Sequence, residues 1–196
     1  MSIPVFENPI DLFNAWFAEA LECGLQEPTA MCLSTCDAAG QPSSRMVLLK
    51  GVDDRGFVFY TNFQSRKGRE LLENPKASLC FYWMPLGKQV RIAGDVTRVS
   101  DEEADAYFAT RDRQSQIGAY ASNQSQPLNT MAGLEKRFEE FSNKFEGVEI
   151  QRPGHWSGFR VRPDEIEFWM NKPFRLHERL LYTRDGQEWR TALLYP

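Results

Sequence analysis

The chain has 196 residues, of which 42% are hydrophobic and 26% are charged, so it is long enough for one domain with a buried core and has no compositional sign of extended disorder. Its 27 acidic residues outnumber its 23 Lys and Arg residues, and the net charge of −4 disfavours a surface that binds nucleic acid. Any anionic ligand must therefore be held by a local cluster of basic side chains. We expect a single domain that spans residues 1–196.

The sequence also argues against a secreted or membrane-spanning protein. Residues 1–8 lack the basic and apolar regions of a secretory signal, and no stretch approaches the roughly 18 apolar residues of a membrane span. The four cysteines form no CxxC pair, which favours reduced, mostly buried thiols over a metal site. These features predict a cytoplasmic protein with no metal centre and no membrane partner.

The first half of the chain predicts one helix followed by short strands. Asn8 can cap a helix that begins at Pro9 and ends near Gly24, with apolar residues at helical spacing. Short β-like runs separated by turn residues follow, and they are interrupted by a second helix that runs from Ser65 to Asn74. The predicted strands in this half cover residues 30–36, 45–51, 57–61, 77–83 and 89–99.

The second half mixes helices and strands. Ser100 to Glu103 has the form of a capping box and opens a helix that continues to about Thr110. We expect a polar loop over residues 111–130 and a further helix over residues 131–145. The remaining predicted strands cover residues 156–161, 166–169, 179–182 and 189–194. Many short antiparallel strands with inserted helices predict an α+β protein built on a β-barrel, and the absence of GxGxxG and GxxxxGK[ST] motifs disfavours a doubly wound nucleotide-binding fold.

Two basic residues mark the start of the second predicted helix. With Ser65 as the N-cap, Arg66 and Lys67 fall in the first turn, where free N–H groups and the helix dipole disfavour cations. A bound anion, most simply a phosphate, would explain this arrangement, and side chains that extend into water would explain it equally well.

Two further basic groups lie on a predicted strand and at the end of a predicted helix. Arg45 and Lys50 flank an apolar strand and face opposite sides of it if it is regular, which favours two separate anion sites or one site and one solvent-exposed charge. Tyr107 and Arg111 share a helix face, and Ser115 follows them. This group suits a phosphate monoester, although a basic residue also complements the negative end of a helix dipole.

The last basic group comprises Arg175, His177 and Arg179, which project to the same side of an extended segment. Two guanidinium groups and an imidazole could converge on one cleft or form a solvated polar face of a strand. No Ser or Cys is paired with a suitable His and carboxylate, so the sequence does not support acyl transfer. Together, the basic groups indicate two phosphate sites and a cationic strand, which suits a phosphorylated cofactor and a phosphorylated substrate.

The order of these motifs closely resembles that of the pyridoxine/pyridoxamine 5′-phosphate oxidase family, from about residue 11 to residue 196. The resemblance rests on RMVLLK at 45–50, FVFYTN at 57–62, SRKG at 65–68, QVR at 89–91, YFA at 107–109, SQIGA at 115–119, QS at 124–125, FW at 168–169 and RLH at 175–177. It implies an FMN-binding split β-barrel, an antiparallel Greek-key barrel with peripheral helices. It also implies a homodimer with FMN at the subunit interface.

The resemblance further implies roles for individual residues. Those assigned to the FMN cofactor are Arg45, Met46, Val47, Leu48, Leu49, Lys50, Tyr60, Thr61, Arg66, Lys67, Gln89, Gln124, Ser125, Trp169 and Arg179. Those assigned to the substrate phosphate are Lys50, Tyr107, Arg111 and Ser115, while Arg175 and His177 hold the pyridine ring and are the implied catalytic residues. The implied reaction oxidises pyridoxamine or pyridoxine 5′-phosphate to pyridoxal 5′-phosphate, with hydride transfer to FMN, O2 as electron acceptor and H2O2 as product.

The chain departs from the family pattern at a few positions, and two other functions remain open. Asp112 stands where the family usually has proline, Glu178 where Asp is usual, and Leu193 where a near-terminal Arg is common. A flavin oxidase of the same barrel could act on another ring substrate, such as those of phenazine synthesis. An unphosphorylated substrate would not need the substrate-side set Tyr107, Arg111, Ser115, Arg175 and His177. A non-catalytic barrel that binds flavin or haem would need no substrate-sized cationic pocket.

Overall fold

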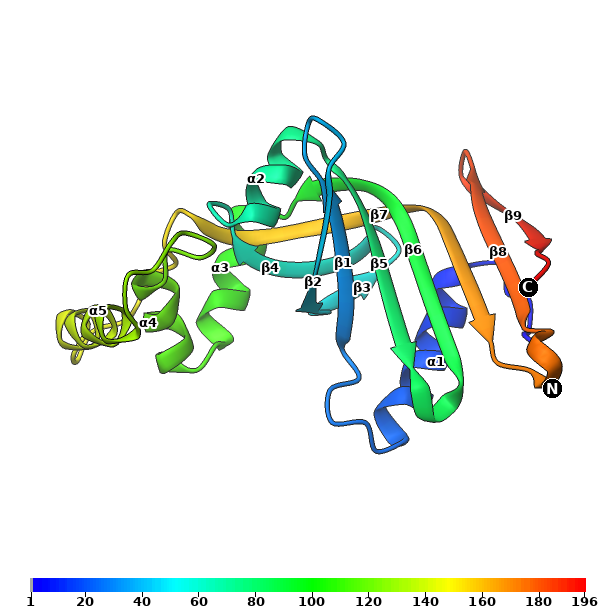
Figure 1. Ribbon diagram of the computed structural model, residues 1–196, viewed down its shortest axis with the longest axis horizontal. Helices are drawn as coiled ribbons and strands as arrows, with labels where there is room; N and C mark the ends of the chain where they lie inside the picture. Colours follow the sequence, from blue (N-terminus) through cyan, green and yellow to red (C-terminus); the bar gives the residue numbers. More distant parts are fainter. Residues whose placement is uncertain (1) are drawn as a thin grey trace.

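The computed structural model describes residues 2–196 as a strongly curled antiparallel sheet with helices around it (Figure 1). The strands are β1 (Ala30–Cys36), β2 (Pro42–Leu48), β3 (Gly51–Asp53), β4 (Gly56–Asn62), β5 (Lys76–Trp83), β6 (Lys88–Arg98), β7 (Trp156–Met170), β8 (Glu178–Asp185) and β9 (Glu188–Leu193). The α-helices are α1 (Pro9–Glu22), α2 (Arg66–Glu73), α3 (Asp101–Thr110), α4 (Arg113–Ala121) and α5 (Met131–Lys144), and two 3-10 turns are η1 (Met84–Leu86) and η2 (Pro173–Arg175). The curled antiparallel sheet with peripheral helices confirms the predicted fold class.

The segment 42–53 joins the two ends of the curled sheet. The strand order is β2-β1-β5-β6-β7-β4-β3, with β8 and β9 extending from β7. The first half of the segment, β2, pairs with β1, and the second half, β3, pairs with β4. Between them, Leu49 N donates to Thr29 O at 2.9 Å and Lys50 N donates to Val58 O at 2.8 Å. One interrupted strand therefore bridges both edges, as closure of a barrel requires.

Strand β7 is continuous over residues 156–170, so the prediction of two strands at 156–161 and 166–169 is wrong. One edge of β7 pairs with β6 along its length, whereas the other edge pairs with β4 through its first part and with β8 through its last part. Pro163 interrupts the sequence pattern, but it lies where the β6–β7 register shifts opposite Gly94. A bulge of this kind accommodates a proline inside a strand.

Gly94 is needed for this bulge because the backbone of β7 approaches it closely. A Cβ atom at position 94 would lie 1.9 Å from the carbonyl oxygen of Arg162. We expect Gly94→Ala to lower the free energy of unfolding by about 3 kcal/mol or more, measured by urea denaturation. Gly133→Ala is the control, since its Cβ would meet only Thr130 Oγ1 at 3.4 Å. The helical control should change stability by no more than about 1 kcal/mol, and equal effects of the two substitutions would contradict the close approach.

The predicted helix caps are confirmed, but the predicted loop over residues 111–130 is partly wrong. Asn8, Ser65 and Ser100 each accept a backbone N–H bond in the first turn of the helix that follows. Residues 113–121 form the additional helix α4, whose N-cap Asp112 accepts from Ser115 N at 2.8 Å. Only Ile117 and Ala121 of α4 are buried, so the helix is too polar to show a clear apolar face in its sequence.

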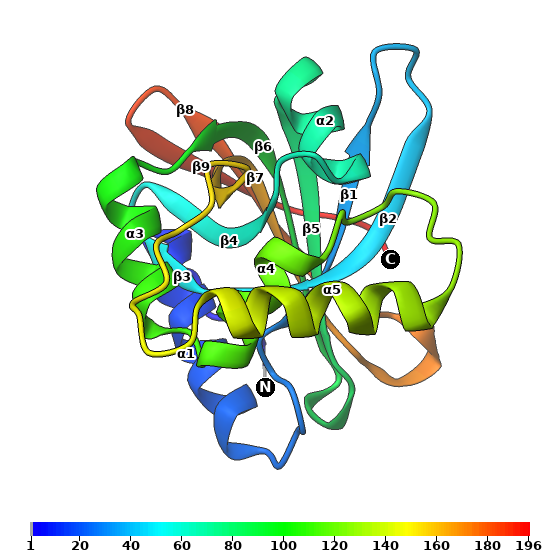
Figure 2. The ribbon, with the colours of Figure 1, turned by 90° about the vertical axis from the view of Figure 1, so that its left-hand side faces the viewer.

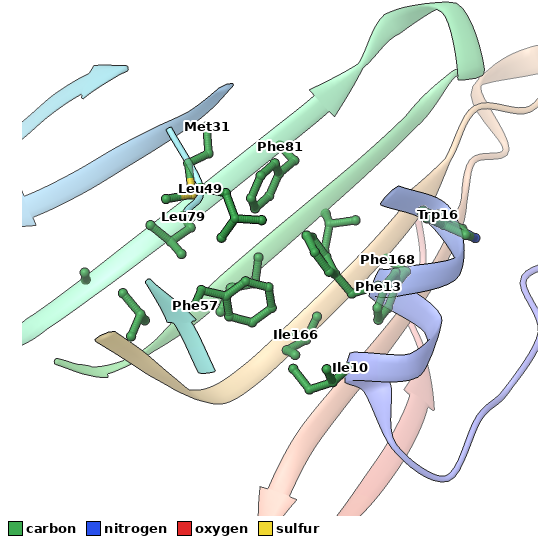
Figure 3. Close-up of a cluster of buried hydrophobic side chains, with 14 of the residues drawn as sticks. Ile10, Phe13, Trp16, Met31, Leu49, Phe57, Leu79, Phe81, Ile166 and Phe168 are labelled. Atoms are coloured by element: carbon green, nitrogen blue, oxygen red, sulfur yellow. The ribbon is translucent and has the colours of Figure 1, made fainter. Parts of the chain in front are cut away.

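The main core lies between α1 and the inner face of the curled sheet (Figure 3). The ring of Phe13 lies edge-on to Phe57 at 4.9 Å and to Phe81 at 5.2 Å between centroids, and Trp16 packs against Phe168 at 5.2 Å. A second cluster joins α3, α4 and α5 to the start of β7, and its buried members are Phe108, Ile117, Ile150 and Trp156. This second cluster fixes the helices that carry part of the candidate site.

The cysteines are only half-buried, in contrast to the mostly buried thiols expected from the sequence. Cys23, Cys32, Cys36 and Cys80 are all free thiols. Among residues 2–196, no helix is both long enough and apolar enough to cross a membrane.

Candidate active site

A cationic pocket of about 680 Å³ lies between the β2–β4 part of the sheet and helices α3 and α4. Four basic side chains line it: Arg45, Lys50, Lys67 and Arg111. None of the described residues that line it carries a carboxylate, so the pocket suits an anionic ligand despite the negative net charge of the chain. Other predicted site residues in the lining are Met46, Val47, Leu48, Tyr60, Thr61, Tyr107, Ser115, Gln124 and Ser125.

Arg45 and Lys50 line the same pocket, because the strand between them is not regular and the expectation of opposite sides holds only for a regular strand. Strand β2 ends at Leu48, and Lys50 belongs to the interruption where the chain changes partner from β1 to β4. The alternation of side chains holds only within a regular strand. The interruption therefore brings both cations to one cavity, while Leu49 is buried in the core.

Lys67 is a buried cation whose hydrogen-bond partners are neutral. Its side-chain Nζ donates to Thr61 Oγ1 at 3.0 Å, to Gln124 Oε1 at 3.2 Å and to Ser65 Oγ at 3.5 Å. Burial, together with the nearby charge of Arg45, lowers the pKa of Lys67 to about 8. An anion beside Lys67 would stabilise this charge, as the position of the residue at a helix N-terminus predicted.

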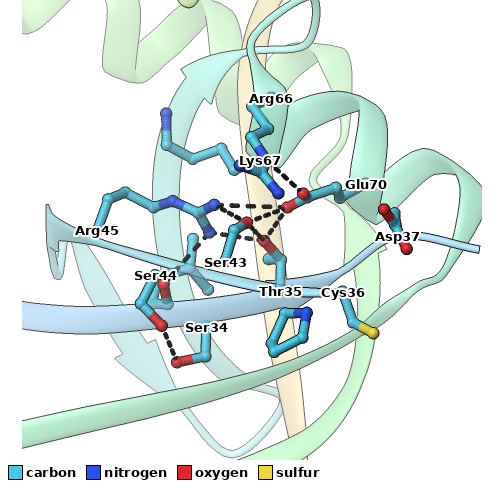
Figure 4. A network of polar contacts seen from close by, with 12 residues as sticks. Ser34, Thr35, Cys36, Asp37, Ser43, Ser44, Arg45, Arg66, Lys67 and Glu70 are labelled. Atoms are coloured by element: carbon cyan, nitrogen blue, oxygen red, sulfur yellow. Dashed lines mark hydrogen bonds and ion pairs between the residues drawn. The ribbon is translucent and has the colours of Figure 1, made fainter. Parts of the chain in front are cut away.

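Arg66 lies beside the pocket in a network centred on Glu70 (Figure 4). The Nε atom of Arg66 donates to Glu70 Oε1 at 2.8 Å, and Glu70 Oε2 accepts from Ser43 Oγ at 2.6 Å and from Thr35. Arg45 Nη2 lies 3.4 Å from the same Oε2 atom. Although burial opposes its ionisation, hydrogen bonds from Ser43, Thr35 and Arg66 lower the pKa of Glu70 to about 2. Glu70 was not among the predicted site residues, although its i+4 spacing from Arg66 was visible in the sequence.

Stacked aromatic rings form one wall of the pocket and position Arg111. The Tyr60 and Tyr107 rings stack at 4.0 Å between centroids, and Tyr60 stacks on Trp156 at 5.3 Å. The guanidinium of Arg111 lies 4.7 Å from the centre of a Trp156 ring. Trp156 was also absent from the predicted site residues, because its role depends on contacts with α3 that are distant in sequence.

Arg111 carries an unpaired hydrogen-bond donor inside this site. Its Nη1 atom is buried and has no hydrogen-bond partner among the described residues. Burial lowers the pKa of the guanidinium, and the nearby Tyr107 and Asp112 oppose this shift. Asp112 is the adjacent carboxylate, and it caps α4 through Ser115 N. Unpaired buried donors are uncommon in native proteins, so this atom marks a place for an acceptor from a ligand.

The segment from the end of β7 to the start of β8 lies at the opposite end of the molecule from α4 (Figure 1). Five other predicted site residues lie in this segment or pair with it. Trp169 pairs with Gln89 across β6–β7 and with Arg179 across β7–β8. The His177 ring lies 4.6 Å from that of Trp169, and its Nδ1 atom accepts from Lys172 N at 3.3 Å. Within one chain, the predicted site residues therefore do not form a single site. One set lines the pocket, and a second group comprises Gln89, Trp169, Arg175, His177 and Arg179.

Backbone strain occurs both in the pocket and beside the second group, which contains His177. Within residues 2–196, three non-glycine residues have positive φ: Ser125 at 66°, Phe174 at 60° and Arg175 at 61°. Ser125 lines the pocket, and Phe174 and Arg175 immediately precede the His177 segment. Phe174 is also 93% exposed. Strained backbone is concentrated at functional sites, which supports a role for both groups.

Comparisons with known proteins agree with this geometry. The family model described as pyridoxamine 5′-phosphate oxidase matches residues 17–145, and the model described as pyridoxine 5′-phosphate oxidase C-terminal dimerisation region matches residues 156–196, which indicates a homodimer. Curated pyridoxine/pyridoxamine 5′-phosphate oxidases from Rubrobacter xylanophilus and Gluconobacter oxydans are 54% and 52% identical to this chain, each over 96% of it. The matches cover 87% and 94% of those proteins.

Solved structures with a similar fold also include proteins related to this family. PhzG from Burkholderia lata 383, in complex with tetrahydrophenazine-1-carboxylic acid, has a TM-score of 0.92 and 36% identity over 100% of both chains. A pyridoxamine 5′-phosphate oxidase-related, FMN-binding protein from Nostoc punctiforme has a TM-score of 0.77 and 19% identity over 94% of this chain and 97% of that one, which supports the fold alone. The chain therefore belongs to the pyridoxine/pyridoxamine 5′-phosphate oxidase family of oxidoreductases.

Proposed function

We propose that this protein oxidises pyridoxamine 5′-phosphate and pyridoxine 5′-phosphate to pyridoxal 5′-phosphate with FMN as cofactor, O2 as electron acceptor and H2O2 as product. The observation that carries the proposal is the carboxylate-free pocket with four basic side chains, in which Lys67 is buried among neutral partners and Arg111 has a buried Nη1 atom without a hydrogen-bond partner. The phosphates of a phosphorylated cofactor and a phosphorylated substrate would supply the anionic acceptors that these two side chains lack among the described residues. We also propose a cytoplasmic location.

The phosphate of FMN is assigned to Arg45, Arg66 and Lys67, with Thr61 and Gln124 as neutral partners. These donors fit a phosphate. The Nζ atom of Lys67 already has neutral hydrogen-bond partners, and burial lowers its pKa, so an anion would stabilise its charge. The remaining cofactor positions on this side are the strand residues 46–50 with Tyr60 and Ser125. When bound, FMN supplies the two-electron chemistry by accepting a hydride from the substrate's 4′ carbon.

The substrate phosphate is assigned to Lys50, Tyr107, Arg111 and Ser115. The buried, unpaired Nη1 of Arg111 supports this assignment, since a phosphate oxygen would satisfy it. Burial raises the pKa of Tyr60 to about 12, so its ring stays neutral beside the anions and supports Tyr107 by stacking. The protein thus fixes the phosphate at one end and orients the reacting ring at the other.

The ring-binding residues are assigned to a second subunit of a homodimer. The segment between β7 and β8, which contains Arg175 and His177, lies at the other end of the molecule from α4 (Figure 1), and it belongs to the residues that match the dimerisation region. In this arrangement, Arg175 and His177 hold the pyridine ring and assist proton removal. Gln89, Trp169 and Arg179 complete the flavin site across the same interface.

The likeness to PhzG favours a second candidate, a flavin oxidase that acts on an unphosphorylated ring. The relatives named pyridoxine/pyridoxamine 5′-phosphate oxidase are more similar, at 52–55% identity against 36%. A ring substrate without phosphate would also leave the basic group centred on Arg111 without an acceptor for the buried Nη1 atom. A non-catalytic flavin or haem carrier would leave the same group unexplained.

The test is an aerobic assay of the FMN-loaded protein with pyridoxamine 5′-phosphate and with pyridoxine 5′-phosphate. We expect pyridoxal 5′-phosphate and H2O2 in equal amounts, with unphosphorylated pyridoxamine as a substrate of at least about 100-fold lower kcat/KM. Protein that retains FMN but turns over neither phosphorylated substrate would refute the activity while sparing the fold. Turnover of a phenazine precursor instead would support the second candidate.

A further inference from the structure

Glu70 is a carboxylate placed among the basic side chains assigned to the flavin phosphate, where a second negative charge would ordinarily repel the ligand. Its side chain is 6% exposed. One oxygen, Oε1, accepts from Arg66 Nε at 2.8 Å, and the other, Oε2, lies 3.4 Å from Arg45 Nη2 (Figure 4). A single carboxylate therefore connects two guanidinium groups from α2 and β2.

The carboxylate is itself fixed by neutral donors on β1 and β2. Oε2 accepts from Ser43 Oγ at 2.6 Å and from the hydroxyl of Thr35, which is 3% exposed. The hydroxyls of Thr35 and Ser43 also accept from Arg45, the first through Nη1 at 2.6 Å. Glu70 thus belongs to a preformed network in which Thr35, Ser43 and Glu70 itself all restrain Arg45, instead of being a mobile surface acid.

The exposed fractions of the two arginines show what Glu70 adds. The Arg66 side chain is 53% exposed and the Arg45 side chain is 21% exposed, so Arg66 in particular would sample many rotamers in water without a partner. The bond to Glu70 uses Nε of Arg66, which leaves its terminal Nη groups to meet a ligand. Restraining a long side chain before binding removes part of the entropic cost of binding.

The charges also match a phosphate monoester. Arg45, Arg66 and Lys67 carry three positive charges when all are protonated, and Glu70 reduces the sum to two. A phosphate monoester carries about −1.5 to −2 at pH 7. The carboxylate therefore lets three cations approach one another without exceeding the charge of the ligand.

We propose that Glu70 is a positioning residue that holds Arg45 and Arg66 in the arrangement that receives the phosphate of FMN. This inference rests on the proposed function, because it requires FMN to be the ligand of this end of the pocket. It differs from a purely structural role, in which Glu70 would stabilise the β1–β2–α2 contact and affect any ligand equally. It also differs from a repulsive role, in which removing Glu70 would strengthen phosphate binding.

The experiment compares FMN with riboflavin, which has the same ring and ribityl chain but no phosphate. Dissociation constants of both ligands for the flavin-free protein are measured by quenching of flavin fluorescence. We expect Glu70→Gln to weaken FMN binding about 10-fold or more and to change riboflavin binding less than about twofold. Glu73→Gln is the matched control, because Glu73 is an exposed acid in the same helix, and it should leave both constants unchanged.

A second variant covers the case in which Glu70→Gln fails to fold. Glu70→Asp keeps the buried charge but is one methylene too short to connect both arginines, so it should lower the preference for FMN over riboflavin at least about threefold. An unchanged or increased preference in the folded variants overturns the proposal, as does an equal loss of both ligands. Wild-type protein that shows no preference for FMN would instead refute the proposed cofactor site, so the two failures are distinguishable.

Discussion

Replacement of Lys67 by Met should weaken FMN binding about 100-fold and make the flavin-free protein more stable by roughly 1–2 kcal/mol. The two effects have opposite signs for one reason. Lys67 is a buried ammonium held by neutral oxygens, and burial lowers its pKa to about 8, so the folded protein bears a desolvation cost that a bound phosphate would offset. Met has a similar length and removes both the cost and the attraction.

The measurements are FMN titration and urea denaturation of wild type, Lys67→Met and the control Lys136→Met, in which an exposed charge on α5 is removed. The control should change neither quantity appreciably. A Lys67→Met protein that binds FMN as tightly as wild type would exclude Lys67 from the phosphate site.

The lowered pKa of Lys67 also predicts a pH dependence. Between about pH 8 and the ordinary lysine value of 10.5, Lys67 is mostly neutral in the folded protein and protonated in the unfolded chain. Because the unfolded state then binds more protons, the Lys67 contribution to stability rises with pH across this window. FMN affinity should fall as pH rises above about 8, and Lys67→Met should lack both trends.

Arg111→Met should lower kcat/KM for pyridoxamine 5′-phosphate by about 100- to 1,000-fold, mainly through KM, and should leave FMN affinity unchanged. The expected loss is large because the guanidinium is partly buried on Trp156 and its unpaired Nη1 is poised for a charge-assisted hydrogen bond. Met preserves much of the packing volume against Trp156 and Phe108, so the change mainly removes the charge and the donors.

Steady-state kinetics with phosphorylated and unphosphorylated pyridoxamine measure this effect directly. Unphosphorylated pyridoxamine should be turned over equally by wild type and Arg111→Met, since it has no phosphate to lose. The neighbouring control is Arg113→Met, because Arg113 binds the carbonyl oxygens of Phe145 and Val148 and should affect stability instead of substrate preference. An equal loss with both substrates would assign Arg111 a structural role.

The parts of the fold that local chemistry determines were predictable from the sequence. Asn8, Ser65 and Ser100 cap helices because their side chains satisfy backbone donors within three residues. The same local argument suggests a phosphate site at Lys67, which stays a prediction. Helix α4 was missed because its two buried residues are too few to give a periodic apolar face. Pro163 concealed the continuity of β7, since only the opposite strand reveals the bulge that accommodates it.

Features of the site that depend on contacts distant in sequence could not be predicted. Arg45 and Lys50 share a pocket because the chain changes partner strand at Leu49, and no local pattern marks that change. Glu70 and Trp156 were overlooked because their importance arises from Thr35, Ser43 and Tyr60 on other elements.

The separation of Arg175 and His177 from the pocket leads to the most direct test of the shared site. Arg111→Ala and Arg175→Ala chains that carry different affinity tags can be co-expressed, and the heterodimer can be purified through both tags. A homodimer of either variant has two impaired sites. In the heterodimer, the unchanged pocket of one chain meets the unchanged Arg175 and His177 of the other. If the site is shared, the heterodimer should recover about half of the wild-type turnover per dimer, because one of its two sites is intact. Turnover no higher than that of the two parent variants would contradict an active site built from both subunits.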